Sequence, residues 1–199
     1  IPGAAEKVVY PFGYGLSYTT FDVETVSAGV VNSNCTSEAN KLYAKVRVTN
    51  TGKFSGKEVV QVYIAKPQGK LGKPAKELAA FEKTRELQPG ESQLMILTWE
   101  INDMASYDDL GKVKKSAYVL EAGSYDIYVG TSVRDVTKAD YSYILNRDVI
   151  TEQLSAKLVP TSLPKRMLAD GSYEALPQSE PVDTDYSAIG NIDPSLTEG

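Results

Sequence analysis

Residues 42–50 read LYAKVRVTN and alternate between apolar and more polar side chains. Positions 42, 44, 46 and 48 are apolar, with Lys45, Arg47 and Thr49 between them. This period of two indicates a β-strand with one buried face and one face toward solvent. Residues 50–56, which read NTGKFSG, supply the turn chemistry that would end the strand.

Similar strands are expected on both sides of this segment. Residues 59–64 are rich in β-branched and aromatic side chains, which strands favour. Pro89 and Gly90, a pair that suits a type II turn, precede a strand at residues 93–99. The remaining strands are predicted at residues 20–26, 113–120, 125–130 and 141–145. Roughly seven short strands at such intervals predict an all-β, immunoglobulin-like Greek-key β-sandwich.

Two local features refine this fold. Tyr125 follows Gly123 at the start of a late strand. In such sandwiches a tyrosine corner forms there, its hydroxyl bonding back to nearby backbone; a tyrosine simply buried in the strand is the alternative. Residues 101–107 favour one short helical turn, with Asn102 or Asp103 as its cap.

The chain is interpreted as three parts. Residues 1–18 form an interdomain junction, residues 19–150 form the sandwich, and residues 151–199 form an irregular, extended tail or linker. In the tail, prolines and scattered Asp, Ser and Thr break any periodicity.

Charge and composition exclude several classes of function. The formal net charge of the 199 residues is −5, which disfavours nucleic acid and anionic membranes as partners, and no segment approaches the ~20 apolar residues of a membrane span. The absence of histidine excludes Ser-His-Asp and Cys-His catalysis and His-ligated zinc. A single cysteine favours a reducing, cytoplasmic compartment. We therefore expect no metal and no cofactor.

Carboxylates are the remaining candidates for catalysis. A glycosidase needs only two of them, about 5 to 10 Å apart. With 26 acidic residues in the chain, however, a chance pair is easy to find. Asp108 and Asp109 are interpreted as a solvated turn, because charged side chains are mostly exposed.

The aromatic residues allow two interpretations. Trp99, Tyr107, Tyr118 and Tyr128 could form a sugar-stacking platform, but packing is favoured because aromatics more often anchor cores and interfaces. Both alternating faces of residues 93–99 are apolar, so one is expected to cover the core and the other to pack on a neighbouring domain.

Residues 10–21, which read YPFGYGLSYTTF, carry a specific motif. It resembles the junction in family 3 glycoside hydrolases between the α/β sandwich domain and the fibronectin type III-like domain. That family commonly reads Pro-Phe-Gly-Tyr-Gly-Leu-Ser-Tyr-Thr-x-Phe there. Further matches follow in order within residues 46–63, 76–81, 87–91 and 123–130, so the resemblance covers roughly residues 8–147.

The resemblance implies a non-catalytic, fibronectin type III-like module of a larger enzyme. Such enzymes look like retaining β-glucosidases or β-xylosidases that act on terminal β-D-glucosides in carbohydrate metabolism. Their Asp nucleophile lies in a Ser-Asp-Trp type motif of a barrel domain, and the acid/base usually comes from the α/β domain. Here Trp99 is the only Trp and follows Thr98, so no catalytic, substrate-binding or metal residue is assigned. The tail is similar to the connector of circularly permuted members, in which the barrel follows.

Three roles are therefore open. The first is a structural module that stabilises the remaining catalytic domains of its parent, its expected partners, and that could also form a homodimer. The second is a carbohydrate-binding module. In the third, the loop at residues 66–76 shapes the active-site entrance. Four aromatic side chains of the junction are the expected domain-interface residues, because leaving them in water is costly: Tyr10, Phe12, Tyr14 and Tyr18.

Overall fold

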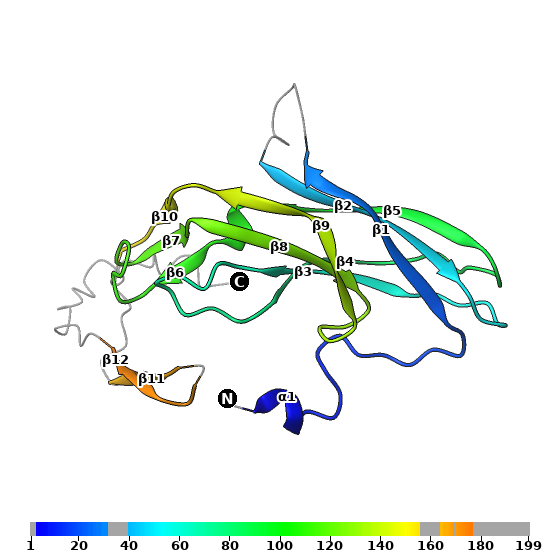
Figure 1. Cartoon of the computed structure of the whole chain (residues 1–199), viewed down its shortest axis with the longest axis horizontal. Coiled ribbons are helices and arrows are strands. Elements are labelled where there is room, and N and C mark those ends of the chain that lie inside the picture. The colour runs from blue at the N-terminus through cyan, green and yellow to red at the C-terminus, as the bar shows by residue number, and fades with distance from the viewer. Residues whose placement is uncertain (1–2, 32–39, 156–163, 169, 177–199) are drawn as a thin grey trace, which may run out of the picture.

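The computed structural model describes residues 3–31, 40–155, 164–168 and 170–176. Two antiparallel sheets make up the main body, as the strand pattern predicted (Figure 1). The three-stranded sheet has the order β1 (Phe21–Val30), β2 (Lys41–Asn50), β5 (Ser92–Glu100). The four-stranded sheet has the order β4 (Glu77–Lys83), β3 (Val59–Ala65), β8 (Gly123–Gly130), β9 (Val136–Leu145).

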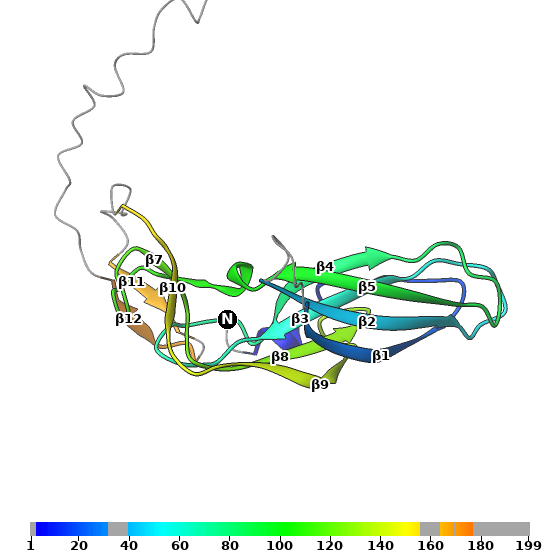
Figure 2. The ribbon, with the colours of Figure 1, turned by 90° about the horizontal axis from the view of Figure 1, so that it is seen from above.

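Smaller elements complete the described chain. A third sheet, at one end of the long axis, has the order β10 (Val149–Gln153), β7 (Ala117–Leu120), β6 (Ser106–Asp108) (Figure 2). A hairpin of β11 (Lys165–Met167) and β12 (Tyr173–Ala175) lies at the same end. The two short helices are α1 (Ala4–Lys7) and the 3₁₀ turn η1 (Asn102–Met104). Neither of these helices of the described residues has the length and apolar character that a membrane span requires.

The core lies between the two main sheets and follows the predicted alternation. Strand β2 buries every second residue and pairs in unbroken register with β5, whose Met95, Leu97 and Trp99 also point inward. Strand β3 is buried almost throughout. Fully burying one such aliphatic side chain contributes roughly 1.5–3 kcal/mol. The fully buried aliphatic residues of β2 and β3 are Leu42, Ala44, Val46, Val48, Val60, Val62 and Ile64.

The tyrosine corner is confirmed. The Tyr125 hydroxyl donates a 2.8 Å hydrogen bond to the backbone carbonyl oxygen of Glu121, four residues upstream. The ring is 1% exposed, and this burial raises the pKa of Tyr125 far above its ordinary value. The hydroxyl is therefore a permanent donor that fixes the β7–β8 connection.

The segment between β6 and β7 corrects two predictions. The strand expected at residues 113–120 begins only at Ala117, because the preceding residues form a turn around Asp108. Asp108 was interpreted as solvated, but it is fully buried. Its carboxylate accepts hydrogen bonds from four backbone N–H groups, those of Gly111, Lys112, Val113 and Lys114.

The buried Asp108 carboxylate is stabilised as an anion. Burial alone would raise its pKa, but the four N–H hydrogen bonds outweigh burial, so the pKa of Asp108 is lowered. An Asp side chain in a turn can thus organise the surrounding backbone. The general expectation that charged side chains are exposed did not predict this.

Other element boundaries also differ from the predictions. Strand β1 runs on to Val30, and β9 starts earlier, at Val136. Strand β4, with the sequence ELAAFEK, was not predicted, because it is short of β-branched residues and does not alternate. The helical turn η1 is confirmed, but Ile101 occupies its cap position without a side-chain hydrogen bond, so Asn102 and Asp103 are not caps.

Part of the expected tail is folded onto the sandwich. Strand β10 crosses residue 150 and continues to Gln153. In the hairpin, Arg166 contacts Asp109 at 3.1 Å and Glu174 at 2.6 Å, and Glu174 in turn contacts Lys112 at 2.9 Å. Two cations and two anions therefore alternate between the hairpin and the β6–β7 turn.

Candidate docking surface and pocket

The segment that precedes β1, residues 8–18, is the most exposed apolar part of the described chain, and we call it the aromatic arm. The four residues expected at an interface are all exposed: Tyr10 by 69%, Phe12 by 64%, Tyr14 by 47% and Tyr18 by 96%. Val8, Val9 and Leu16 are exposed as well. Monomeric proteins rarely expose large apolar patches, so this surface is suited to binding another protein surface.

Hydrogen bonds fix the backbone of the aromatic arm. The carboxamide nitrogen of Gln61, on β3, donates to the carbonyl oxygens of Gly13 (3.0 Å) and Thr131 (2.6 Å). The carboxamide oxygen accepts from the Tyr63 hydroxyl, whose pKa is raised by burial. The backbone N–H of Val133 donates to the Phe12 carbonyl oxygen at 3.0 Å.

Gly13 is the arm residue at which this backbone geometry requires glycine. Its φ of +79° lies in the left-handed region, and a Cβ added there would meet Oε1 of Gln61 at 2.0 Å. The arm thus holds its backbone against the ends of β3 and β8 while its aromatic side chains remain outside. Sequence reasoning missed Gln61, although a polar residue inside the apolar run at residues 59–64 was a usable signal.

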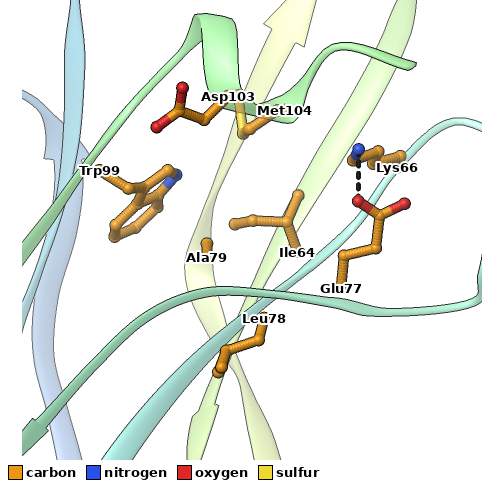
Figure 3. Close-up of a pocket in the computed structure, with 8 residues that line it drawn as sticks. All are labelled: Ile64, Lys66, Glu77, Leu78, Ala79, Trp99, Asp103 and Met104. Atoms are coloured by element: carbon orange, nitrogen blue, oxygen red, sulfur yellow. Dashed lines mark ion pairs between the residues drawn. The ribbon is translucent and has the colours of Figure 1, made fainter. Parts of the chain in front are cut away.

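A pocket of about 220 Å³ opens between β3, β4, β5 and η1 (Figure 3). Its charged groups come from the segment after β3, from β4 and from η1. Lys66 follows β3, is 6% exposed, and forms a 2.5 Å ion pair with Glu77 of β4. Asp103 of η1 is exposed. The lining residues are Ile64, Lys66, Glu77, Leu78, Ala79, Trp99, Asp103 and Met104.

The loop at residues 66–76 is held in one place by a buried carboxylate. Glu121 accepts hydrogen bonds from the backbone N–H groups of Lys70 and Leu71 and forms a buried ion pair with Lys73. The backbone carbonyl oxygen of Glu121 accepts the hydrogen bond from the Tyr125 hydroxyl. Glu121 therefore anchors both the loop and the tyrosine corner. Buried Leu71 joins Ala117 and Val119 in a second, small core.

The aromatic residues considered as a sugar-stacking platform do not share one surface. Trp99 is 5% exposed and belongs to the core. Tyr107 and Tyr118 face each other across β6 and β7, with ring centroids 5.5 Å apart. Lys76 lies 4.8 Å from the centre of the Tyr128 ring. Within the described residues, no group of three His, Cys, Asp or Glu side chains could hold a metal ion.

Strand β5 covers the core with one face, as predicted, and its other face is exposed. Leu94 and Ile96 are 50% and 60% exposed, whereas the alternate residues point into the core. This apolar face is a second surface without a covering element among the described residues.

Comparison with known proteins agrees with this architecture. Residues 58–133 match the family described as "Fibronectin type III-like domain". The chain is 60% identical, over 95% of its length, to Beta-glucosidase A of Butyrivibrio fibrisolvens, and 41% identical, over 89%, to a Beta-glucosidase of Ruminococcus albus. It is also similar to the solved structure of a β-glucosidase from Paenibacillus barengoltzii, with a TM-score of 0.76 and 42% identity over 88% of this chain.

The sandwich, the tyrosine corner and these matches define the class, a fibronectin type III-like domain. The chain is similar to the fibronectin type III-like part of β-glucosidases of the family 3 glycoside hydrolases. It spans 24%, 18% and 20% of the three relatives named above.

Proposed function

We propose that this chain is a non-catalytic structural module of a larger β-glucosidase, and that the aromatic arm docks it onto the catalytic domains of the same polypeptide. The parent would be a retaining hydrolase of terminal β-D-glucosides. The observation that carries the proposal is the arm itself, four exposed aromatics on a backbone fixed by hydrogen bonds.

The energetics of the arm support docking. At about 25 cal/mol per Å² of apolar area, four exposed aromatic rings represent a large cost in water. The relatives indicate which surface the arm would contact, because more than three quarters of the length of each relative lies outside the matched part. A preformed backbone also lowers the entropy that docking would otherwise cost.

Two finer roles are part of the proposal. The rigid attachment of the loop at residues 66–76 to Glu121 supports its use as a fixed wall beside an active-site entrance. A second copy of the chain is the other surface that the arm could cover. Sedimentation of the isolated chain distinguishes the two, since a homodimer through the arm would dissociate when Phe12 and Tyr14 are replaced by Ala.

The docking role is tested by calorimetry on two proteins, the isolated chain and its full-length parent. Phe12→Ala with Tyr14→Ala should leave the melting temperature of the isolated chain nearly unchanged, because both rings are already exposed. The same pair should lower the melting temperature of the parent. Ile144→Ala is the matched control, because Ile144 is 58% exposed at the end of β9 away from the arm. Equal effects of both variants on the parent would overturn the docking role.

A further inference from the structure

The indole nitrogen of Trp99 is a buried hydrogen-bond donor without an acceptor. It is the single buried side-chain polar atom of the described residues that lacks a partner. Nearly all such groups in folded proteins are paired, with protein, water or a ligand, because leaving one unpaired is costly. Figure 3 shows the nitrogen on the side of the ring that faces Ile64 and Lys66, toward the pocket.

The polar groups of the pocket restrict what could enter it. Lys66 and Glu77 neutralise each other in their 2.5 Å ion pair. Asp103 then leaves the pocket with a net negative charge, which disfavours phosphates and carboxylates. Ile64, Ala79 and other aliphatic side chains line the rest, a surface unsuited to a strongly hydrated metal ion.

A hydroxyl group suits both Trp99 and Asp103, because it can accept a hydrogen bond from the indole N–H and donate one to a carboxylate. Carbon-bound hydrogens of the same molecule would pack on the aliphatic lining. A volume of about 220 Å³ lies below the ~300–1,000 Å³ of drug-sized sites, so one small molecule fills it.

We propose that the pocket between β4 and η1 binds one small neutral polyhydroxy compound, of monosaccharide size or less, through Trp99 and Asp103. The site is separate from the aromatic arm and does not depend on the docking role. Because the indole nitrogen is buried, binding requires lining side chains to shift, and Met104, an unbranched and adaptable side chain, is the one suited to do so.

Trp99 provides a direct readout, since it is the only tryptophan of the chain. The isolated chain is titrated with glycerol, glucose and cellobiose while the intrinsic fluorescence is recorded, with inorganic phosphate as the anion probe. We expect a saturable change with glucose or glycerol at millimolar concentrations, because so small a ligand buries few atoms. Phosphate should give no change.

Two carboxylate variants decide the result. Asp103→Asn should weaken binding about tenfold, the loss expected when a hydrogen bond to a charged group becomes a neutral one. Asp22→Asn, which removes an exposed carboxylate of β1, should bind as the unmodified chain does. Identical, non-saturating curves for all three proteins would overturn the proposal, and saturation by phosphate alone would overturn the ligand class.

Discussion

At the scale of single residues, buried polar side chains organise the loops of this protein. Asp108 gathers four backbone N–H groups, Glu121 anchors the loop at residues 66–76, and Gln61 holds the aromatic arm. Removing any of these polar side chains would leave buried donors or acceptors unpaired. That costs more free energy than an ordinary hydrogen bond contributes on balance. These three residues therefore determine the backbone conformation of the segments that they bind.

Asp108→Asn should destabilise the chain and alter its response to acid. One amide oxygen cannot replace two carboxylate oxygens that accept four N–H bonds, so we expect a loss of about 1–3 kcal/mol at neutral pH. The folded pKa of Asp108 is lowered, so its stabilisation is full above the unfolded value of about 4 and is lost as pH falls through the folded pKa.

Urea unfolding of the chain and the Asp108→Asn variant between neutral and acidic pH measures this contribution. The two stabilities should converge as pH drops below about 4. A constant difference across the whole range would show that the carboxylate charge has no part in holding the turn.

Gln61→Glu should release the aromatic arm. A carboxylate cannot donate to the carbonyl oxygens of Gly13 and Thr131, so the arm loses its side-chain anchor. Hydrogen exchange should then accelerate at the Val133 amide, which donates to Phe12, while strand β2 stays protected. Tyr63→Phe is the control, since it removes only the bond accepted by Gln61. Unchanged Val133 exchange in Gln61→Glu would refute the anchor.

At the scale of elements, the sequence was most informative where one face is buried. The alternation in β2 and the Gly123–Tyr125 spacing predicted a strand and a tyrosine corner, because both depend on neighbours along the chain. The turn around Asp108 could not be predicted, since it depends on four N–H groups converging in space. The pocket was missed for the same reason, because Lys66, Trp99 and Asp103 meet only in the folded sheets.

We expect ion pairs to hold the hairpin of β11 and β12 against the β6–β7 turn. A single exposed ion pair contributes only about 0.2–1 kcal/mol, but Arg166 and Glu174 join a network of two cations and two anions. Arg166→Gln should therefore accelerate chymotrypsin cleavage after Tyr173, which is 59% exposed. Arg85→Gln, which breaks an exposed pair with Glu91, serves as the control. Equal cleavage rates in both variants would show that the ion pairs do not hold the hairpin.

At the scale of the whole molecule, we expect the chain to lack catalytic activity of its own. The purified chain should not hydrolyse an aryl β-glucoside above background, because it lacks histidine and any match to the family's nucleophile motif. Turnover that survives repurification and disappears when one carboxylate is mutated would contradict this expectation.

We infer that the catalytic domains of the parent cover the aromatic arm, and hydroxyl-radical footprinting measures that burial directly. In the isolated chain Tyr10, Phe12, Tyr14 and Tyr18 should oxidise rapidly, whereas the buried ring of Tyr63 should not. In the full-length parent the four arm residues should become nearly as unreactive as Tyr63. Arm residues that oxidise as fast in the parent as in the isolated chain would contradict the claim.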